Sequence, residues 1–124
     1  MSNTFQSYRD LVVWQTAMAL AEDCYRLTAI FPREEMFGLT SQIRRAAASI
    51  AANIAEGHGR ETTGSFIQSL RIAQGSTKEL ETHLLLAQRV GIAKSEAVEA
   101  SLGQCAEVGK MVRALIRSLQ DKSE

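Results

Sequence analysis

The stretch "FIQSLRIAQGSTKELETHLLLAQRVG", residues 66–91, decides the fold because its apolar side chains recur at alternating steps of four and three residues. An α-helix has about 3.6 residues per turn, so positions with this spacing lie on one face. The seam consists of Phe66, Leu70, Ala73, Thr77, Leu80, Leu84 and Ala87. We therefore expect one long helix over residues 63–90, closed by Gly91.

Three further segments carry the same period and are expected to form helices over residues 10–29, 40–56 and 95–120. Asp10 is a suitable N-cap for the first of them, and Pro32 and Gly38 interrupt the connection that follows it. Gly57 stands where a left-handed C-terminal cap is expected. Four helices with short connections predict a single all-α domain over residues 1–124, an antiparallel up-down four-helix bundle.

Charge and composition exclude several classes of protein. The chain has 14 basic and 14 acidic residues, so it lacks the global positive charge that favours nucleic acid or membrane surfaces. No apolar run approaches the roughly 20 residues of a membrane-spanning helix, and the first residues lack a signal-peptide pattern. The two cysteines, Cys24 and Cys105, form no CxxC motif. These features predict a soluble cytoplasmic protein.

The helix expected over residues 40–56 is unusual because it carries three distinct faces. Its aliphatic stripe, which must face the core, consists of Leu39, Ile43, Ala47, Ile50 and Ile54. A polar stripe is formed by Gln42, Arg45, Ser49, Asn53 and Glu56. The remaining face holds Arg44, Ala48, Ala51, Ala52 and Ala55. Small side chains permit a close approach, so we expect this last face to pack against something beyond its own bundle.

The polar stripe has two interpretations. It is either a hydrogen-bonded ladder, within or between subunits, or a ligand or catalytic groove. Arg45 and Glu56 are too far apart on one helix to pair, so each is expected to find a partner elsewhere. A hydrolase that uses Glu56 and His58 would represent the second interpretation. The structural ladder is the favoured one.

Motifs for other chemistry are missing. The loop "GHGRETTG", residues 57–64, fits neither GxGxxG nor GxxxxGK, and no strand precedes it, so it is expected to be a turn between helices. A di-iron centre needs Glu-x-x-His motifs, which neither His58 nor His83 completes. Cys24 and Cys105 fall on apolar seams and are expected to be small buried hydrophobes. We expect no catalytic residue, metal, cofactor or small-molecule substrate.

Two short basic stripes are candidates for nucleic-acid binding. Lys110, Arg113 and Arg117 share a face of the last helix, and Arg71 and Lys78 share a face of the long helix. Such stripes are usually solvated helix faces. A cyclic assembly would nevertheless repeat them around a ring, and affinity for phosphate grows with the number of contacts. No aromatic platform or base-reading motif is present, so any binding should tolerate different sequences.

Four runs in the chain, from Tyr8 to about Leu119, resemble the four-helix-bundle family named after the 23S rRNA intervening-sequence protein. They are "YRDLVVWQTAMALA", "FGLTSQIRRAAASIAANIAEGHGR", "FIQSLRIAQGSTKELETHLLLAQRVG" and "EVGKMVRALI". The resemblance implies a bacterial homopentamer of unassigned biochemical function. The family is similar to the accessory variability protein of diversity-generating retroelements, a pentameric bundle that associates with nucleic acid and a reverse transcriptase.

Two features of this chain depart from the family pattern. Family members often have a proline and an aromatic residue where this chain has Ala51 and His58. Their loop before the third helix is often rich in lysine, whereas "RETTGSF" carries only Arg60. The second departure weakens a phosphate-binding interpretation of this loop.

The sequence thus favours a non-enzymatic oligomeric adaptor or scaffold whose partners are other copies of itself and RNA or an RNA-handling protein. The alternative is a purely structural or protein-interaction oligomer that binds no nucleic acid. No membrane partner is expected.

Overall fold

The computed structural model describes residues 7–122, and within them it contains helices and no strands. The four α-helices are α1 (Val12–Thr28), α2 (Leu39–His58), α3 (Thr63–Arg89) and α4 (Ser95–Lys122). Two short 3-10 helices, η1 (Tyr8–Asp10) and η2 (Arg33–Glu35), precede α1 and α2. The prediction of an all-α fold with four main helices is confirmed for this part of the chain.

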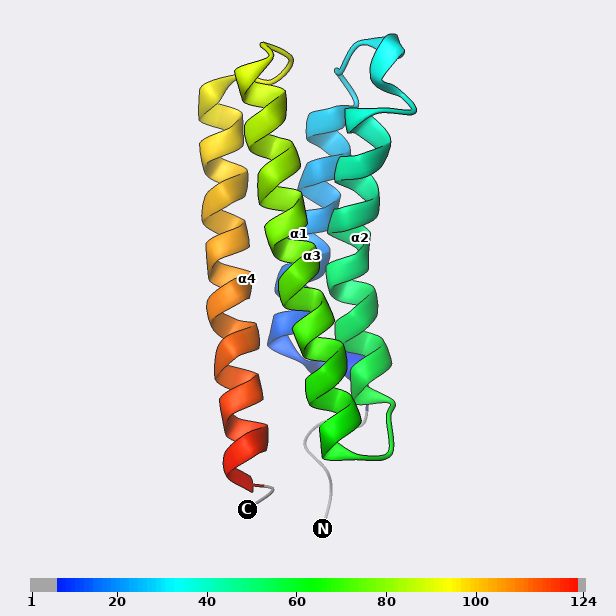
Figure 1. Ribbon diagram of the computed structural model, residues 1–124, viewed down its shortest axis with the longest axis vertical. Coiled ribbons are helices and arrows are strands. Elements are labelled where there is room, and N and C mark those ends of the chain that lie inside the picture. Colours follow the sequence, from blue (N-terminus) through cyan, green and yellow to red (C-terminus); the bar gives the residue numbers. More distant parts are fainter. Residues whose placement is uncertain (1–6, 123–124) are drawn as a thin grey trace.

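The helices are packed side by side, and the chain reverses direction at each connection (Figure 1). Helix α1 contacts α2 and α4, and α3 contacts the same two helices, so α1 and α3 lie diagonally opposite each other. The start of α1 and the end of α4 lie at one end of the bundle, and η2 lies at the other (Figure 1). None of the helices in the described range is apolar enough over a sufficient length to cross a membrane.

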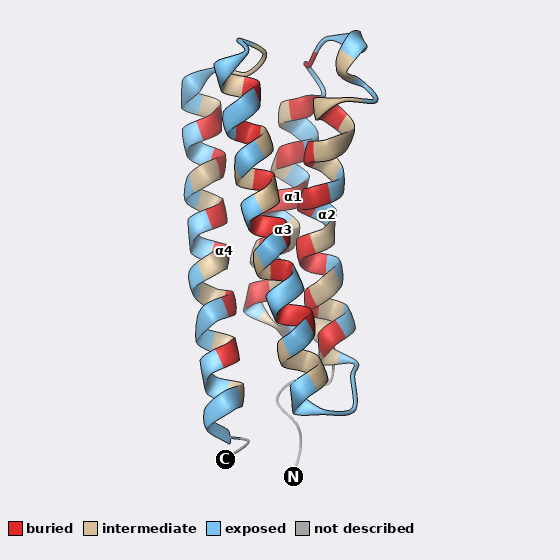
Figure 2. Cartoon of the chain, in the orientation of Figure 1, coloured by how far each residue is buried: buried red, intermediate tan, exposed pale blue. Residues whose placement is uncertain are grey.

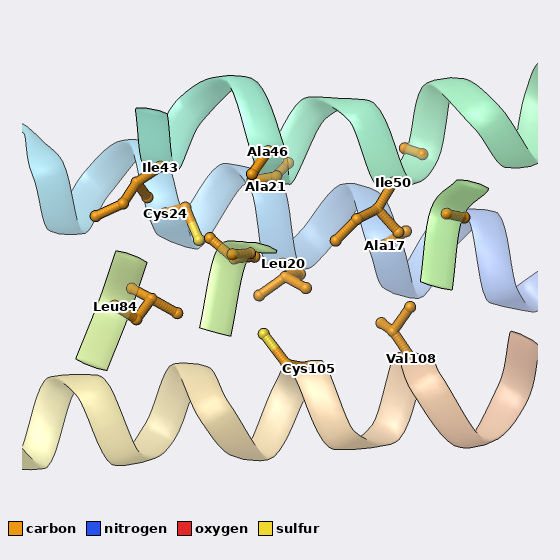
Figure 3. Packing of buried hydrophobic residues seen from close by; sticks show 14 of the residues in the cluster. Ala17, Leu20, Ala21, Cys24, Ile43, Ala46, Ile50, Leu84, Cys105 and Val108 are labelled. Carbon is orange, nitrogen blue, oxygen red and sulfur yellow. The ribbon is translucent and has the colours of Figure 1, made fainter. Parts of the chain in front are cut away.

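Each helix turns a buried stripe toward a common interior (Figure 2). The largest fully buried side chains include Leu20, Ile50, Leu84 and Val108, one from each helix. In Figure 3, Leu20 and Cys105 point toward each other across the core. The aliphatic stripe of α2 lies in this core as expected, with Ile43, Ala47, Ile50 and Ile54 all 0% exposed.

Small residues bring α1 and α2 close together. Ala17 is 0% and Ala21 8% exposed on α1, and Ala46 is 0% and Ala51 3% exposed on α2. Figure 3 shows Ala21 next to Ala46. The alanines of α2 therefore serve, in part, the packing of the bundle itself.

Two expected helix ends are wrong. Asp10 belongs to η1, and Leu11, in an extended conformation, precedes α1 without a side-chain cap. Gly57 is not a left-handed cap either, because α2 continues to His58 and Gly59 follows with φ −82°. Among the described residues, Gly91 alone has a positive φ, 82°, as its place after α3 requires.

Gly57 is instead a point of close helix contact. An added Cβ would lie 2.8 Å from Phe66 Cδ1 and 2.8 Å from Ser69 Cβ, both on α3. A glycine at this position lets the end of α2 approach the start of α3 just before the turn that joins them.

Candidate nucleic-acid interface and polar ladder

A groove of about 580 Å³ runs between α3 and α4 and collects basic residues from both helices. Lys78 enters from α3, and Lys110 and Arg113 enter from α4, while Gln74 and Glu81 add polar groups. Because α3 and α4 pack against each other, the two basic stripes of the sequence become neighbours. The groove thus unites three of the five predicted basic residues.

The remaining two basic residues extend this surface. Arg117 lies one helical turn beyond Arg113 on α4, and Arg71 lies one turn before Gln74 on α3, both exposed. Lys78 forms an ion pair with Glu81 at 3.2 Å. Within residues 7–122, no carboxylate pairs with Arg71, Lys110, Arg113 or Arg117. Four of the five charges are therefore available to an external anion.

The polar stripe of α2 forms a ladder with α3 in the same chain. Arg45 Nη2 lies 3.1 Å from Glu79 Oε2 and also donates to Gln42 Oε1. The hydroxyls of Ser49 and Ser76 are 2.8 Å apart. These contacts support the structural interpretation of the stripe and give Arg45 the partner that α2 alone could not supply.

Toward the C-terminal end of α2, the ladder is formed within the helix and the turn that follows it. Asn53 Nδ2 donates to the Ser49 carbonyl at 2.8 Å and to its hydroxyl at 3.1 Å. Glu56 pairs with Arg60 at 3.3 Å. The ring of His58 packs edge-on against Phe66, with centroids 6.0 Å apart. No described hydrogen bond or ion pair joins Glu56 to His58, so the two groups of the hydrolase hypothesis are not brought together.

Arg44 faces α1. Its Nε donates to Thr28 Oγ1 at 2.8 Å, its Nη2 donates to the Tyr25 carbonyl at 3.3 Å, and its guanidinium lies 4.5 Å from the centre of the Tyr25 ring. These bonds satisfy groups in the last turn of α1. Arg44 therefore joins two helices of one chain.

The alanine face of α2 divides into buried and exposed parts. Ala51 is only 3% exposed in the single chain and packs in the core, although it also lines the groove described next. Ala48 and Ala52 are exposed, and with Trp14 and Met18 of α1 they line an apolar groove of about 660 Å³. The first helix carries a stripe of apolar residues, Trp14, Met18, Ala21 and Tyr25, that could have indicated this groove, but only the packing of α1 against α2 places it beside the alanines.

The buried thiols take no part in these surfaces. Burial raises the pKa of Cys24 and of Cys105 to about 12. Both side chains are 0% exposed, so they remain protonated and act as apolar core residues. Among the described residues, no group of three or more histidines, cysteines or carboxylates is arranged to hold a metal ion.

Comparison with known proteins places this fold. The sequence model of the 23S rRNA-intervening sequence protein family matches residues 9–114. A crystal structure from Bacteroides thetaiotaomicron, of a protein with unknown function from the S23 ribosomal protein family, is similar with a TM-score of 0.76 and 27% identity. The match covers 85% of this chain and 98% of that chain. No curated protein matches. The chain belongs to the 23S rRNA-intervening sequence protein family.

Proposed function

We propose that the protein is a non-enzymatic, cytoplasmic homo-oligomeric adaptor that holds RNA by its phosphate backbone along the groove between α3 and α4. The observation that carries the proposal is the convergence of Lys78, Lys110 and Arg113 on one groove. Lys110 and Arg113 have no carboxylate partner among the described residues and are free to pair with phosphate, whereas Lys78 also contacts Glu81. The chain as a whole has no excess positive charge, so this attraction is local to the groove.

Recognition in this groove should not depend on the RNA sequence. The groove contains no aromatic side chain on which a base could stack, since its lining residues are polar, charged or small. Contacts to phosphate position a nucleic acid without reading its bases. We therefore expect similar affinity for different single-stranded RNAs and a strong dependence on salt.

Oligomerisation is the second part of the proposal. The groove lined by Trp14, Met18, Ala48 and Ala52 offers an apolar surface that a second copy could cover. A closed cyclic assembly has heterologous interfaces, so this surface would meet a different one on the neighbouring subunit. The family resemblance implies five subunits. A ring would repeat the basic groove in every subunit and multiply the phosphate contacts.

The test replaces Lys110, Arg113 and Arg117 with glutamine in one variant and measures binding of a mixed-sequence single-stranded RNA by fluorescence anisotropy over a range of salt concentrations. Each lost phosphate contact should reduce the salt slope of log K by about 0.7. Losing three contacts in one subunit should therefore reduce the slope by about 2. A control variant replaces Arg9, Arg89 and Lys94, which are exposed but lie outside the groove, and so removes the same charge.

Binding that is equally weakened in both variants would show a mere effect of net charge, and unchanged binding in the first variant would contradict the proposal.

The alternative, a protein-interaction oligomer without nucleic acid, is favoured by the apolar groove on α1 and α2. Native mass spectrometry of protein purified without nuclease separates the two. A nuclease-sensitive excess over the ring mass supports the RNA adaptor, a clean ring mass supports the alternative, and a monomer refutes both.

A further inference from the structure

A third pocket lies where the end of α1, η2 and the beginning of α2 meet. These segments lie at the opposite end of the bundle from the start of α1 (Figure 1). The volume of the pocket is about 440 Å³. Thr40 and Ser41 line it from the first turn of α2, Arg33 from η2 and Arg44 from one turn further along α2. None of the basic residues of the α3–α4 groove takes part in it.

The first turn of α2 offers unpaired backbone donors to this pocket. The residue before the helix is Gly38, which has no side chain to cap it. The amide of Leu39 donates to Glu35 Oε1 at 3.0 Å, whereas the amides of Thr40 and Ser41 have no partner among the described residues. Helix N-termini of this kind attract anions because free N–H groups and the helix dipole act together.

The hydroxyl of Thr40 is a second, independent donor. Thr40 is only 8% exposed and lines the pocket, yet its hydroxyl bonds to no described residue. The two other buried threonines, Thr28 and Thr77, each donate at 2.8 Å to the carbonyl four residues earlier in their helix. Thr40 lies in the first turn, so no helical carbonyl stands four residues before it. The hydroxyl is not among the fully buried side-chain atoms that lack a partner, so it is open to the pocket and free to donate to a bound group.

Three arginines line the pocket, and because Arg45 is paired with Glu79, Arg33 and Arg44 supply the positive charge. Arg44 is held in place by Thr28, by the Tyr25 carbonyl and by the Tyr25 ring, and its Nη1 makes none of these contacts. Arg33 is exposed and has no ion pair within the described chain. The Glu35 carboxylate, which accepts from Leu39, offsets part of this charge but does not line the pocket. The remaining wall is largely apolar and includes Phe31, Pro32 and Met36.

We propose that this pocket binds the phosphate group of a small phosphate monoester. The phosphate accepts from the amides of Thr40 and Ser41 and from the Thr40 hydroxyl, while Arg33 and Arg44 balance its charge. The apolar wall packs against the organic part of the molecule. The pocket's volume of about 440 Å³ lies in the range of sites that hold small molecules. The proposal does not depend on RNA binding at the α3–α4 groove.

The test is a titration of the full-length protein with inorganic phosphate at constant ionic strength, followed by ¹⁵N TROSY NMR. We expect saturable shifts at the amides of Thr40 and Ser41. Thr40→Val removes only the hydroxyl, and Arg33→Gln removes one charge from a side chain that makes no structural contact. Each should raise the Kd about tenfold, as expected for a hydrogen bond to a charged group. Thr16→Val is the matched control, because the Thr16 hydroxyl bonds to the Val12 carbonyl, away from the pocket.

Shifts that fail to saturate, or a Kd that Thr40→Val leaves unchanged, would overturn the proposal. To distinguish the pocket from the α3–α4 groove, each variant is also tested for binding of the other site's ligand. Thr40→Val should leave RNA binding unchanged, and the variant lacking Lys110, Arg113 and Arg117 should leave phosphate binding unchanged. If Thr40→Val weakens RNA binding as much as phosphate binding, the pocket is part of an RNA surface and the small-molecule proposal fails.

Discussion

Replacement of Gly57 by alanine tests the close contact between α2 and α3. The added Cβ would lie 2.8 Å from two carbon atoms, Phe66 Cδ1 and Ser69 Cβ. Carbon atoms in contact normally lie about 3.5 to 4.0 Å apart. The Phe66 ring is partly exposed and can turn aside, but Ser69 is 3% exposed and its Cβ is fixed to the backbone of α3. The helices must therefore move apart.

The expected loss of stability follows from two opposing effects. Overpacking of this kind costs about 1 to 3 kcal/mol. Alanine regains up to about 1 kcal/mol over glycine in a helix interior, and less at Gly57, one residue before the end of α2. We expect Gly57→Ala to lower the free energy of unfolding by about 1 to 2 kcal/mol. At Gly75, in the middle of α3, an added Cβ meets nothing within 4 Å. Gly75→Ala should therefore raise the free energy of unfolding by about 1 kcal/mol.

The two variants thus differ by about 2 to 3 kcal/mol, or roughly 10 °C in melting temperature. Urea unfolding followed by circular dichroism measures the difference, with all proteins at one concentration because subunit association adds to apparent stability. Gly103→Ala, also in open space, is a second control on α4. If Gly57→Ala is as stable as Gly75→Ala, the close contact at Gly57 does not exist in solution.

Two further predictions concern α2 and the buried thiols. Ala51→Arg should lower the free energy of unfolding by more than about 3 kcal/mol, because it buries an unpaired charge. Ala52→Arg should leave the helicity measured by circular dichroism unchanged and reduce the oligomer mass. Light scattering checks the mass, and an unaltered mass would remove the apolar groove from the interface. Cys24 and Cys105 should resist a thiol reagent at pH 8 in the native protein and react after unfolding in urea. Burial raises the pKa of both thiols from 9.0 to about 12. The stability that the neutral thiols contribute is therefore complete below pH 9 and is lost as the pH rises through 12. A free energy of unfolding that stays constant over this range would contradict the assignment.

The helix ends show how far local sequence signals reach. Gly91 was predicted to close α3, and its positive φ agrees with that role. At Gly57 the same kind of signal misled, because a glycine also serves where another helix comes close, as α3 does here. At Asp10, η1 intervenes, and its own N-cap is Ser7, whose hydroxyl accepts from the Arg9 amide. A single sequence does not distinguish these uses of one residue type.

The sequence by itself determined the number of helices, their apolar stripes and the residues of each polar and basic stripe. These follow from the helical period, which fixes the directions of side chains around one axis. Only the tertiary structure decided which stripes meet. Ser49 reaches Ser76, and Lys78 shares a groove with Lys110 and Arg113. Such pairings depend on the rotation and axial offset of neighbouring helices, which side-chain packing sets across the whole core and which no single helix encodes.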